Sequence, residues 1–230
     1  MCGRFASTSS AEDLVAFFEV DEVVEPLPEP SYNIAPTMPI AAVLTSHTDP
    51  QRRQLAAPRW GLVPSWATDA DHGARLINAR VETVASKPSF RAALARRRCL
   101  IPADGYYEWR RSQAASGKIV KQPYYLAPGG SELLAMAGLY EYWRGPTGEW
   151  LVTATIITTT ATDQVGMIHD RMPMVVPRSN WAAWLDRDTD AMVTELLAAP
   201  SFSVVHPVST AVNWAGNNGP QLVAPIEPSE

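Results

Sequence analysis

Hydrophobic positions near the start of the chain follow helical spacing and then change to short extended runs. Leu14, Phe17 and Phe18 recur at three- and four-residue intervals, behind a serine pair and two acidic residues. This pattern predicts a helix that begins at Ser9 or Ser10. Prolines at 26, 28 and 30 predict an extended connector. A loop is expected at 32–37, strands at 40–44 and 54–60, and a helix after 86–89 with Phe90 inward and the arginines outward.

The second half of the chain is rich in β-branched and aromatic residues, which favours strands. We predict strands at 99–102, 105–110, 124–126, 133–143, 150–160, 203–206 and 207–212. Helices are expected at 180–185 and 189–197, and a polar loop at 112–121. Without a repeat or a convincing linker, we expect one α+β domain over 1–230, with a core at 1–212 and a tail at 213–230.

Composition narrows the class of protein. The chain of 230 residues is 46% hydrophobic and 19% charged, as soluble globular proteins are. It shows no apolar run of membrane-spanning length and no signal peptide, and its two cysteines form neither a disulfide framework nor a zinc quartet. A cytoplasmic, reducing location is the expectation, near the nucleoid in a bacterium. Motifs for metal chemistry or nucleotide hydrolysis are missing, so no metal and no cofactor are expected.

Charge is unevenly distributed along the chain. Residues 52–111 hold 12 basic and 5 acidic residues, a surplus of seven in a chain whose net charge is −5. Nearly all of these cations are arginines, which suit forked contacts with phosphate. The distribution favours a local phosphate-binding site over general coating of DNA. For the arginine run at 96–98, a solvated helix face is the better interpretation.

Cys2 follows the initiator methionine directly. Removal of Met1 would place a thiol and an α-amine on one residue, and such a 1,2-aminothiol traps aldehydes as an imine that closes to a thiazolidine. Both groups are partly nucleophilic near neutral pH. The alternative is an ordinary disordered terminus.

Four further clusters could carry chemistry. Asn78 and Arg80 would share one face of a strand and could hold an oxyanion. Glu108 lies among aromatic residues that could raise its pKa for acid–base work. His169 stands beside an aspartate and an arginine. Trp60 and Trp66 could stack on unpaired bases. Each cluster also has a simpler interpretation. Arg80 could form an ion pair with Glu82, and Glu108 could form one with Arg110 or Arg111. His169 could hydrogen-bond a loop carbonyl, and the tryptophans could be core residues.

Together these segments resemble the SOS-response-associated peptidase (SRAP) family, whose members are also called abasic-site processing proteins. The resemblance rests on six blocks in order, MCGRF at 1–5, YNIAPT at 32–37, WGLVP at 60–64, NARVET at 78–83, ADGYYEW at 103–109 and IHDRMP at 168–173. It implies mixed β-sheets curled into a pseudo-barrel with flanking helices. It also implies a single-stranded DNA partner that contains abasic sites, no membrane partner, and a monomer.

The resemblance assigns roles by position. Cys2 matches the nucleophile that forms the thiazolidine crosslink, and the other catalytic positions match Asn78, Glu108 and His169. The DNA-binding positions are Gly3, Arg4, Asn33, Pro36, Trp66, Arg80 and Arg171. Some relatives carry two consecutive tryptophans where this chain has Trp66 and Ala67, so the stacking is expected to differ in detail while the crosslinking chemistry is unaffected.

Three other functions stay open at this level. The Met-Cys-Gly start also resembles glutamine amidotransferase domains, in which an N-terminal cysteine attacks a carboxamide. An endopeptidase would fit the older family name, although only removal of Met1, by the chain itself or by an aminopeptidase, is well supported. A sensor could bind single-stranded DNA without a covalent step. An imine could also lead to strand cleavage by β-elimination, a lyase activity.

Overall fold

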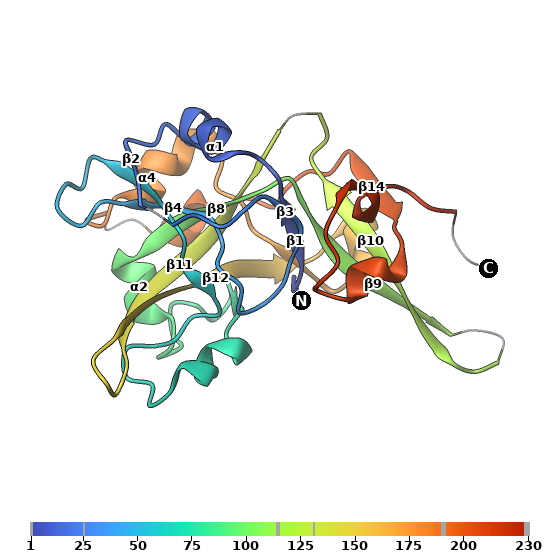
Figure 1. Cartoon of the computed structure of the whole chain (residues 1–230), viewed down its shortest axis with the longest axis horizontal. Helices are drawn as coiled ribbons and strands as arrows, with labels where there is room; N and C mark the ends of the chain where they lie inside the picture. The colour runs from blue at the N-terminus through green and yellow to red at the C-terminus, as the bar shows by residue number, and fades with distance from the viewer. Residues whose placement is uncertain (1, 25, 114–115, 131, 190–191, 228–230) are drawn as a thin grey trace.

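The computed structural model describes residues 2–24, 26–113, 116–130, 132–189 and 192–227. Strands form two sheets and the helices are few and short, so the expected α+β class is confirmed (Figure 1). The α-helices are α1 (Ala11–Phe18), α2 (Arg91–Arg96), α3 (Asp163–Gly166) and α4 (Trp181–Leu185). The 3-10 turns are η1 (Ala70–Arg75), η2 (Arg178–Asn180), η3 (Val193–Leu196), η4 (Thr210–Asn213) and η5 (Pro220–Leu222). No helix in these ranges is long and apolar enough to cross a membrane.

The smaller sheet is antiparallel and contains the first strand of the chain. Its order is β14 (Val204–Pro207), β10 (Ile119–Ala127), β9 (Gly105–Gln113), β1 (Phe5–Ser7) and β3 (Ser31–Ile34). β1 pairs with β9 through Phe5 opposite Tyr106. This register fixes the residues just before β1 against the middle of the sheet.

The larger sheet is mixed and open. Its order is β13 (Arg171–Pro173), β12 (Trp150–Thr160), β11 (Leu134–Arg144), β8 (Arg98–Ala103), β4 (Ala42–Thr45), β5 (Arg53–Ala56) and β2 (Glu22–Val23), and β6 (Arg59–Trp60) and β7 (Asn78–Arg80) run parallel to β12. The expected pseudo-barrel is wrong, because neither strand order returns to its first strand among the described residues. The edge strands β2 and β13 have two and three residues, too few for a closing ladder.

A shared core joins the two sheets. Phe5 and Tyr106 from the smaller sheet pack in one buried cluster with Ile101 and Ile156 from the larger one. Trp60 belongs to this cluster and meets Phe5 edge-on, with ring centroids 5.1 Å apart. Each such buried side chain contributes roughly 1.5–3 kcal/mol. Trp60 is fully buried, so the interpretation of this residue as a base-stacking surface is wrong and the core reading is right.

The first predicted helix is confirmed and a predicted loop is wrong. Ser10 caps α1, accepting a hydrogen bond from the Asp13 amide at 3.1 Å while the Asp13 carboxylate accepts from Ser10 N. The segment 112–121 was expected to be a loop, yet β9 and β10 remain paired as far as Gln113 opposite Ile119. Residues 114 and 115 of this segment lie outside the described ranges. Cross-strand pairing here overrides the polar composition, which had favoured a loop.

Two predicted elements near the C-terminus differ in the structure. Of the helix expected at 189–197, only η3 forms in the described part, and the Thr189 hydroxyl donates back to Ala183 O of α4. The strand expected at 207–212 gives way to η4, which begins where Ser209 Oγ accepts from the Ala211 amide.

The expected tail is part of the packed body. Leu222 is fully buried in a cluster that includes Val208 and Val212. The Ile226 amide donates to Pro207 O at 3.0 Å, which ties the segment to the end of β14. Contacts with the rest of the chain thus continue to residue 226.

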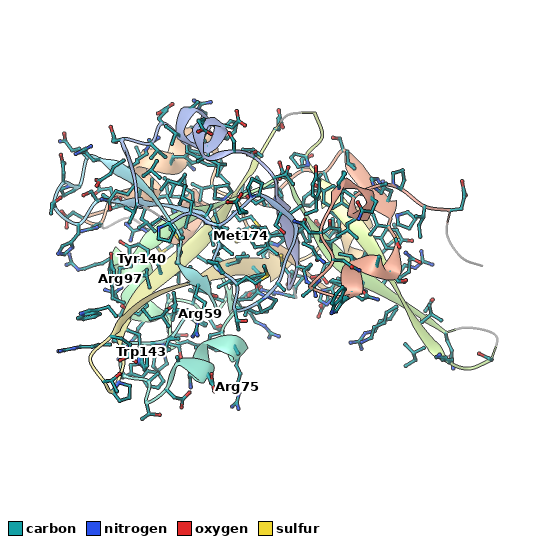
Figure 2. All side chains as sticks on the ribbon, in the orientation of Figure 1. Arg59, Arg75, Arg97, Tyr140, Trp143 and Met174 are labelled. Carbon is teal, nitrogen blue, oxygen red and sulfur yellow. The ribbon has the colours of Figure 1, made fainter. Side chains whose placement is uncertain are left out.

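The arginine run at 96–98 serves the fold. Arg98 is buried and donates to the carbonyls of Leu94 and Trp184, so its expected outward orientation is wrong. Arg97 pairs with Glu141 at 2.6 Å, and its backbone carbonyl accepts from the Tyr140 amide beside it (Figure 2). Two of the three arginines in this run are thus used inside the structure, whereas Arg96 is exposed.

Candidate active site

Cys2 is an ordered and fully buried residue, which overturns the disordered-terminus alternative for this position. Two residues further along the chain, Arg4 O accepts a hydrogen bond of 2.9 Å from the Tyr107 amide, which attaches this end of the chain to β9. The Cys2 carbonyl accepts a hydrogen bond of 2.8 Å from Asn78 Nδ2. Met1 lies outside the described residues. The chain end is therefore held from both sheets at the position of the candidate nucleophile.

Asn78 reaches Cys2 from the larger sheet. It begins β7, where it lies opposite Ile156 of the central strand β12. Its Nδ2 is used by the bond to Cys2, and its Oδ1 is buried without a hydrogen-bond partner among the described residues. A buried acceptor of this kind is costly unless a donor completes it. The amide oxygen can therefore receive an N–H group near the chain end.

Glu108 supplies a buried carboxyl group beside Cys2. The side chain is only 2% exposed on β9, and this burial raises the pKa of Glu108 to about 7. Burial also raises the pKa of the Cys2 thiol, and the charge of Glu108 raises it further. The pKa of the Tyr106 hydroxyl is raised by burial and then by Cys2 and Glu108. These three groups form one electrostatically coupled cluster whose protons are held tightly.

His169 approaches Glu108 from the loop between α3 and β13. Its Nδ1 lies 3.8 Å from Glu108 Oε1 and 2.9 Å from Asp170 Oδ1, and accepts a 3.0 Å bond from the Arg171 amide. Burial lowers the pKa of His169, with the Asp170 carboxylate acting in the opposite direction. Nδ1 thus faces both an acceptor, the Asp170 carboxylate, and a donor, the Arg171 amide.

Arg171 is committed to an ion pair. It is buried and binds both carboxylate oxygens of Glu82, at 2.7 and 2.9 Å, and it donates to Thr158 O. The hydrogen bond from Arg171 lowers the pKa of Glu82. The simpler reading that paired Glu82 with Arg80 is therefore wrong. Arg80 lies exposed at the end of β7 instead.

An open groove of about 670 Å³ joins these groups on the surface. No ion pair between Glu108 and Arg110 or Arg111 is formed among the described residues, so that simpler reading is also wrong. The groove is lined by Arg80, Glu108, Trp109, Arg111, Lys121, His169, Asp170, Arg171 and Asn213. Cations thus line the groove beside Glu108 and His169.

The other predicted DNA-binding residues lie in different settings. Arg4 donates to Asn33 Oδ1 at 2.7 Å and to Val212 O, and Asn33 is buried with its Nδ2 directed at the carbonyls of Trp214 and Asn217. Both side chains fasten the C-terminal segment, and Asn33 presents no exposed surface. Gly3 and Pro36 are half-buried, whereas Trp66 is 58% exposed. Of this group, Trp66 offers the aromatic surface that stacking requires.

Several residues at the site are not among the predicted site residues. Tyr106, Trp109 and Asp170 lie in sequence blocks that contain predicted site residues, and Asp170 is the carboxylate beside His169. Asn213 has no sequence signal. The sequence indicates Arg111 only as a partner for Glu108, and it places Lys121 in an expected loop. Only the register of β9 and β10 places these last two at the groove.

Comparisons with known proteins show the family of this chain. Residues 1–215 match the family model described as SOS response associated peptidase (SRAP). The abasic site processing protein YoqW of Bacillus subtilis is 40% identical, with 97% of this chain and 99% of that protein covered. The abasic site processing protein HMCES of Xenopus tropicalis is 34% identical over 86% of this chain and 67% of its own length.

Solved structures share the fold. A protein from Bacteroides thetaiotaomicron superposes with a TM-score of 0.79 at 24% identity, covering 98% of this chain and all of the other. A phage-related protein from Bordetella bronchiseptica gives a TM-score of 0.70 at 31% identity, with 90% and 94% of the two chains covered. Because the family model spans nearly the whole chain and curated relatives exceed 30% identity, this chain belongs to the SRAP family.

Proposed function

We propose that this protein processes abasic sites in single-stranded DNA by trapping the ring-opened aldehyde on Cys2. The observation that carries the proposal is the position of Cys2, bonded to Asn78 at 2.8 Å and adjoining the Glu108–His169 pair. Relatives such as YoqW and HMCES are named abasic site processing proteins. The exposed cations of the groove supply a path for the DNA backbone.

The covalent chemistry balances without a cofactor. Once Met1 is removed, the α-amine of Cys2 adds to the aldehyde carbon, and the carbinolamine loses one water to give an imine. The Cys2 sulfur then adds to the imine carbon, and the thiol proton ends on the nitrogen. The product is a thiazolidine ring that links the protein to the sugar. Ring closure competes with β-elimination from the imine and so protects the strand.

Glu108 acts as the proton carrier of this sequence. A carboxyl group with a pKa of about 7 is present in both protonation states near neutral pH. It accepts a proton from the Cys2 amine, returns one to the departing hydroxyl, and later moves the thiol proton to nitrogen. The raised pKa of the thiol means that this last transfer needs such a base.

His169 and Asn78 act on the reacting oxygen and nitrogen centres. An abasic sugar is mostly a closed hemiacetal, and the Nε2–H of a neutral His169 donates to the ring oxygen O4′ as it departs. The buried Oδ1 of Asn78 accepts an N–H of the Cys2 amine and orients its lone pair toward the carbonyl carbon. Both roles need side chains that stay neutral near pH 7.

Crosslinking of abasic DNA tests the proposal. The protein is incubated with single-stranded DNA that carries one abasic site, and the products are heated and separated on a denaturing gel without borohydride. We expect a slower-migrating adduct with the wild type and none with Cys2→Ala. Absence of the wild-type adduct, or an undiminished one with Cys2→Ala, contradicts the proposal. A glutaminase assay with the same preparation checks the amidotransferase alternative.

A further inference from the structure

Arg111 and Lys121 form a pair of like charges across two strands. They lie directly opposite each other in the β9–β10 ladder, so their side chains leave the same face of the hairpin. Both are exposed, and neither takes part in an ion pair within the described ranges. Like charges directly opposite each other destabilise a strand pair. A pair retained at this cost is suited to share one anion.

The pair belongs to the groove of the candidate active site. Both residues line it together with Arg80, Glu108 and His169. The positive charge of Arg111 contributes, as the smallest of several causes, to the lowered pKa of His169, which places the guanidinium within electrostatic range of the ring. In the neighbouring wall, Trp109 Nε1 donates to Asn213 Oδ1 at 2.7 Å, which joins β9 to η4.

Building on the proposed function, we propose that Arg111 and Lys121 bind a backbone phosphate of the DNA strand beside the lesion, in the groove that Arg80 also lines. The outer part of the β9–β10 hairpin projects from the body (Figure 1), and Arg111 and Lys121 line the groove from these two strands. Arg111 offers a fork of N–H donors and Lys121 a compact charge, and a phosphate oxygen pair satisfies both. Phosphate binding also removes the repulsion between them.

The test measures binding to an undamaged single strand, which needs no covalent step. We compare Arg111→Gln/Lys121→Gln with a matched control, Arg110→Gln/Lys118→Gln. The control removes two exposed positive charges from the same hairpin at positions that do not line the groove. Affinity is measured by fluorescence anisotropy between about 50 and 200 mM NaCl, the range over which counterion release is read.

We expect the Arg111/Lys121 variant to bind about tenfold more weakly than wild type and the control to stay within about twofold. The plot of log K against log salt has a negative slope. This slope should become less steep by about 0.7 for each phosphate of the single strand that the variant no longer neutralises. Thermal unfolding should show no loss of Tm in either variant, because both pairs are exposed. Equal weakening of both variants, or unchanged affinity and slope in the Arg111/Lys121 variant, overturns the inference. Failure of the proposed function would instead appear as a missing adduct with abasic DNA while these affinities still differ.

Discussion

The side-chain amide of Asn78 on the larger sheet donates to the carbonyl oxygen of Cys2 across 2.8 Å. This bond spans 76 residues of sequence and holds the chain end against Glu108. The nucleophile is therefore positioned by the packing of two sheets, and the loss of one amide should affect its reactivity more than the stability of the fold.

Asn78→Asp should slow crosslinking at saturating abasic DNA by about tenfold or more, because the carboxylate cannot donate to Cys2 O. The same change should cost about 1–3 kcal/mol of unfolding free energy, because it leaves the buried Cys2 O without its donor. Asn180→Asp is the matched control, since Asn180 Nδ2 also donates to a carbonyl, that of Leu196, outside the groove. Equal crosslinking rates for the two variants would remove Asn78 from the site.

Glu108→Gln should stabilise the fold more at pH 8 than at pH 5. Burial raises the pKa of Glu108 from 4.5 to about 7, so the folded state holds its proton more tightly than the unfolded state. In the wild-type protein, the stabilising contribution of protonated Glu108 is complete below its pKa in the unfolded state and is lost as pH rises through its pKa in the folded state. The total is about 3 kcal/mol. Thermal unfolding of both proteins at the two pH values measures this gap. A gap that does not change with pH contradicts the assigned burial effect.

His169→Asn should slow crosslinking of a natural abasic site and spare an acyclic aldehyde. The natural sugar must open its ring before it reacts, whereas an oligonucleotide that carries a linear aldehyde skips this step. General acid catalysis contributes about 10²–10⁴-fold, so a loss within that range is expected for the closed sugar only. Equal losses on both substrates would assign His169 to a later proton transfer.

Glu82→Gln should destabilise the protein more than Arg171→Met. Arg171 is buried and satisfies both Glu82 oxygens and Thr158 O, whereas the Glu82 side chain is 46% exposed. Glu82→Gln leaves the buried guanidinium without its counter-charge, which costs roughly 3 kcal/mol. Arg171→Met returns the half-exposed carboxylate to water and removes one donor from Thr158 O, which costs about 1 kcal/mol. Urea unfolding gives both values. Similar losses in the two variants would contradict the asymmetry.

The sequence predicted those parts of the site that lie in short contiguous blocks. Asn78 and Arg80 were expected to share a strand face, and β7 forms there with Asn78 at Cys2 and Arg80 in the groove. The first helix and most long strands were also predictable, because their hydrophobic spacing is local.

Long-range contacts set the limits of that prediction. Arg4 bonds to Val212 O across 208 residues of sequence, and no local pattern distinguishes this anchoring arginine from one that binds phosphate. Arg98 looks like part of a solvated run until α4 folds over it and presents Trp184 O. The open form of the sheets likewise depends on the short edge strands β2 and β13. The spacing of hydrophobic residues alone does not predict the length of these strands.

Intact-mass spectrometry of the adduct tests the central claim most directly. The wild-type protein is reacted with abasic single-stranded DNA of known mass, beside Cys2→Ala as control. We expect a product whose mass equals that of the protein without Met1 plus the DNA, less one water, and no such product with Cys2→Ala. An adduct that retains Met1, or one that forms equally well without the Cys2 thiol, would contradict the account.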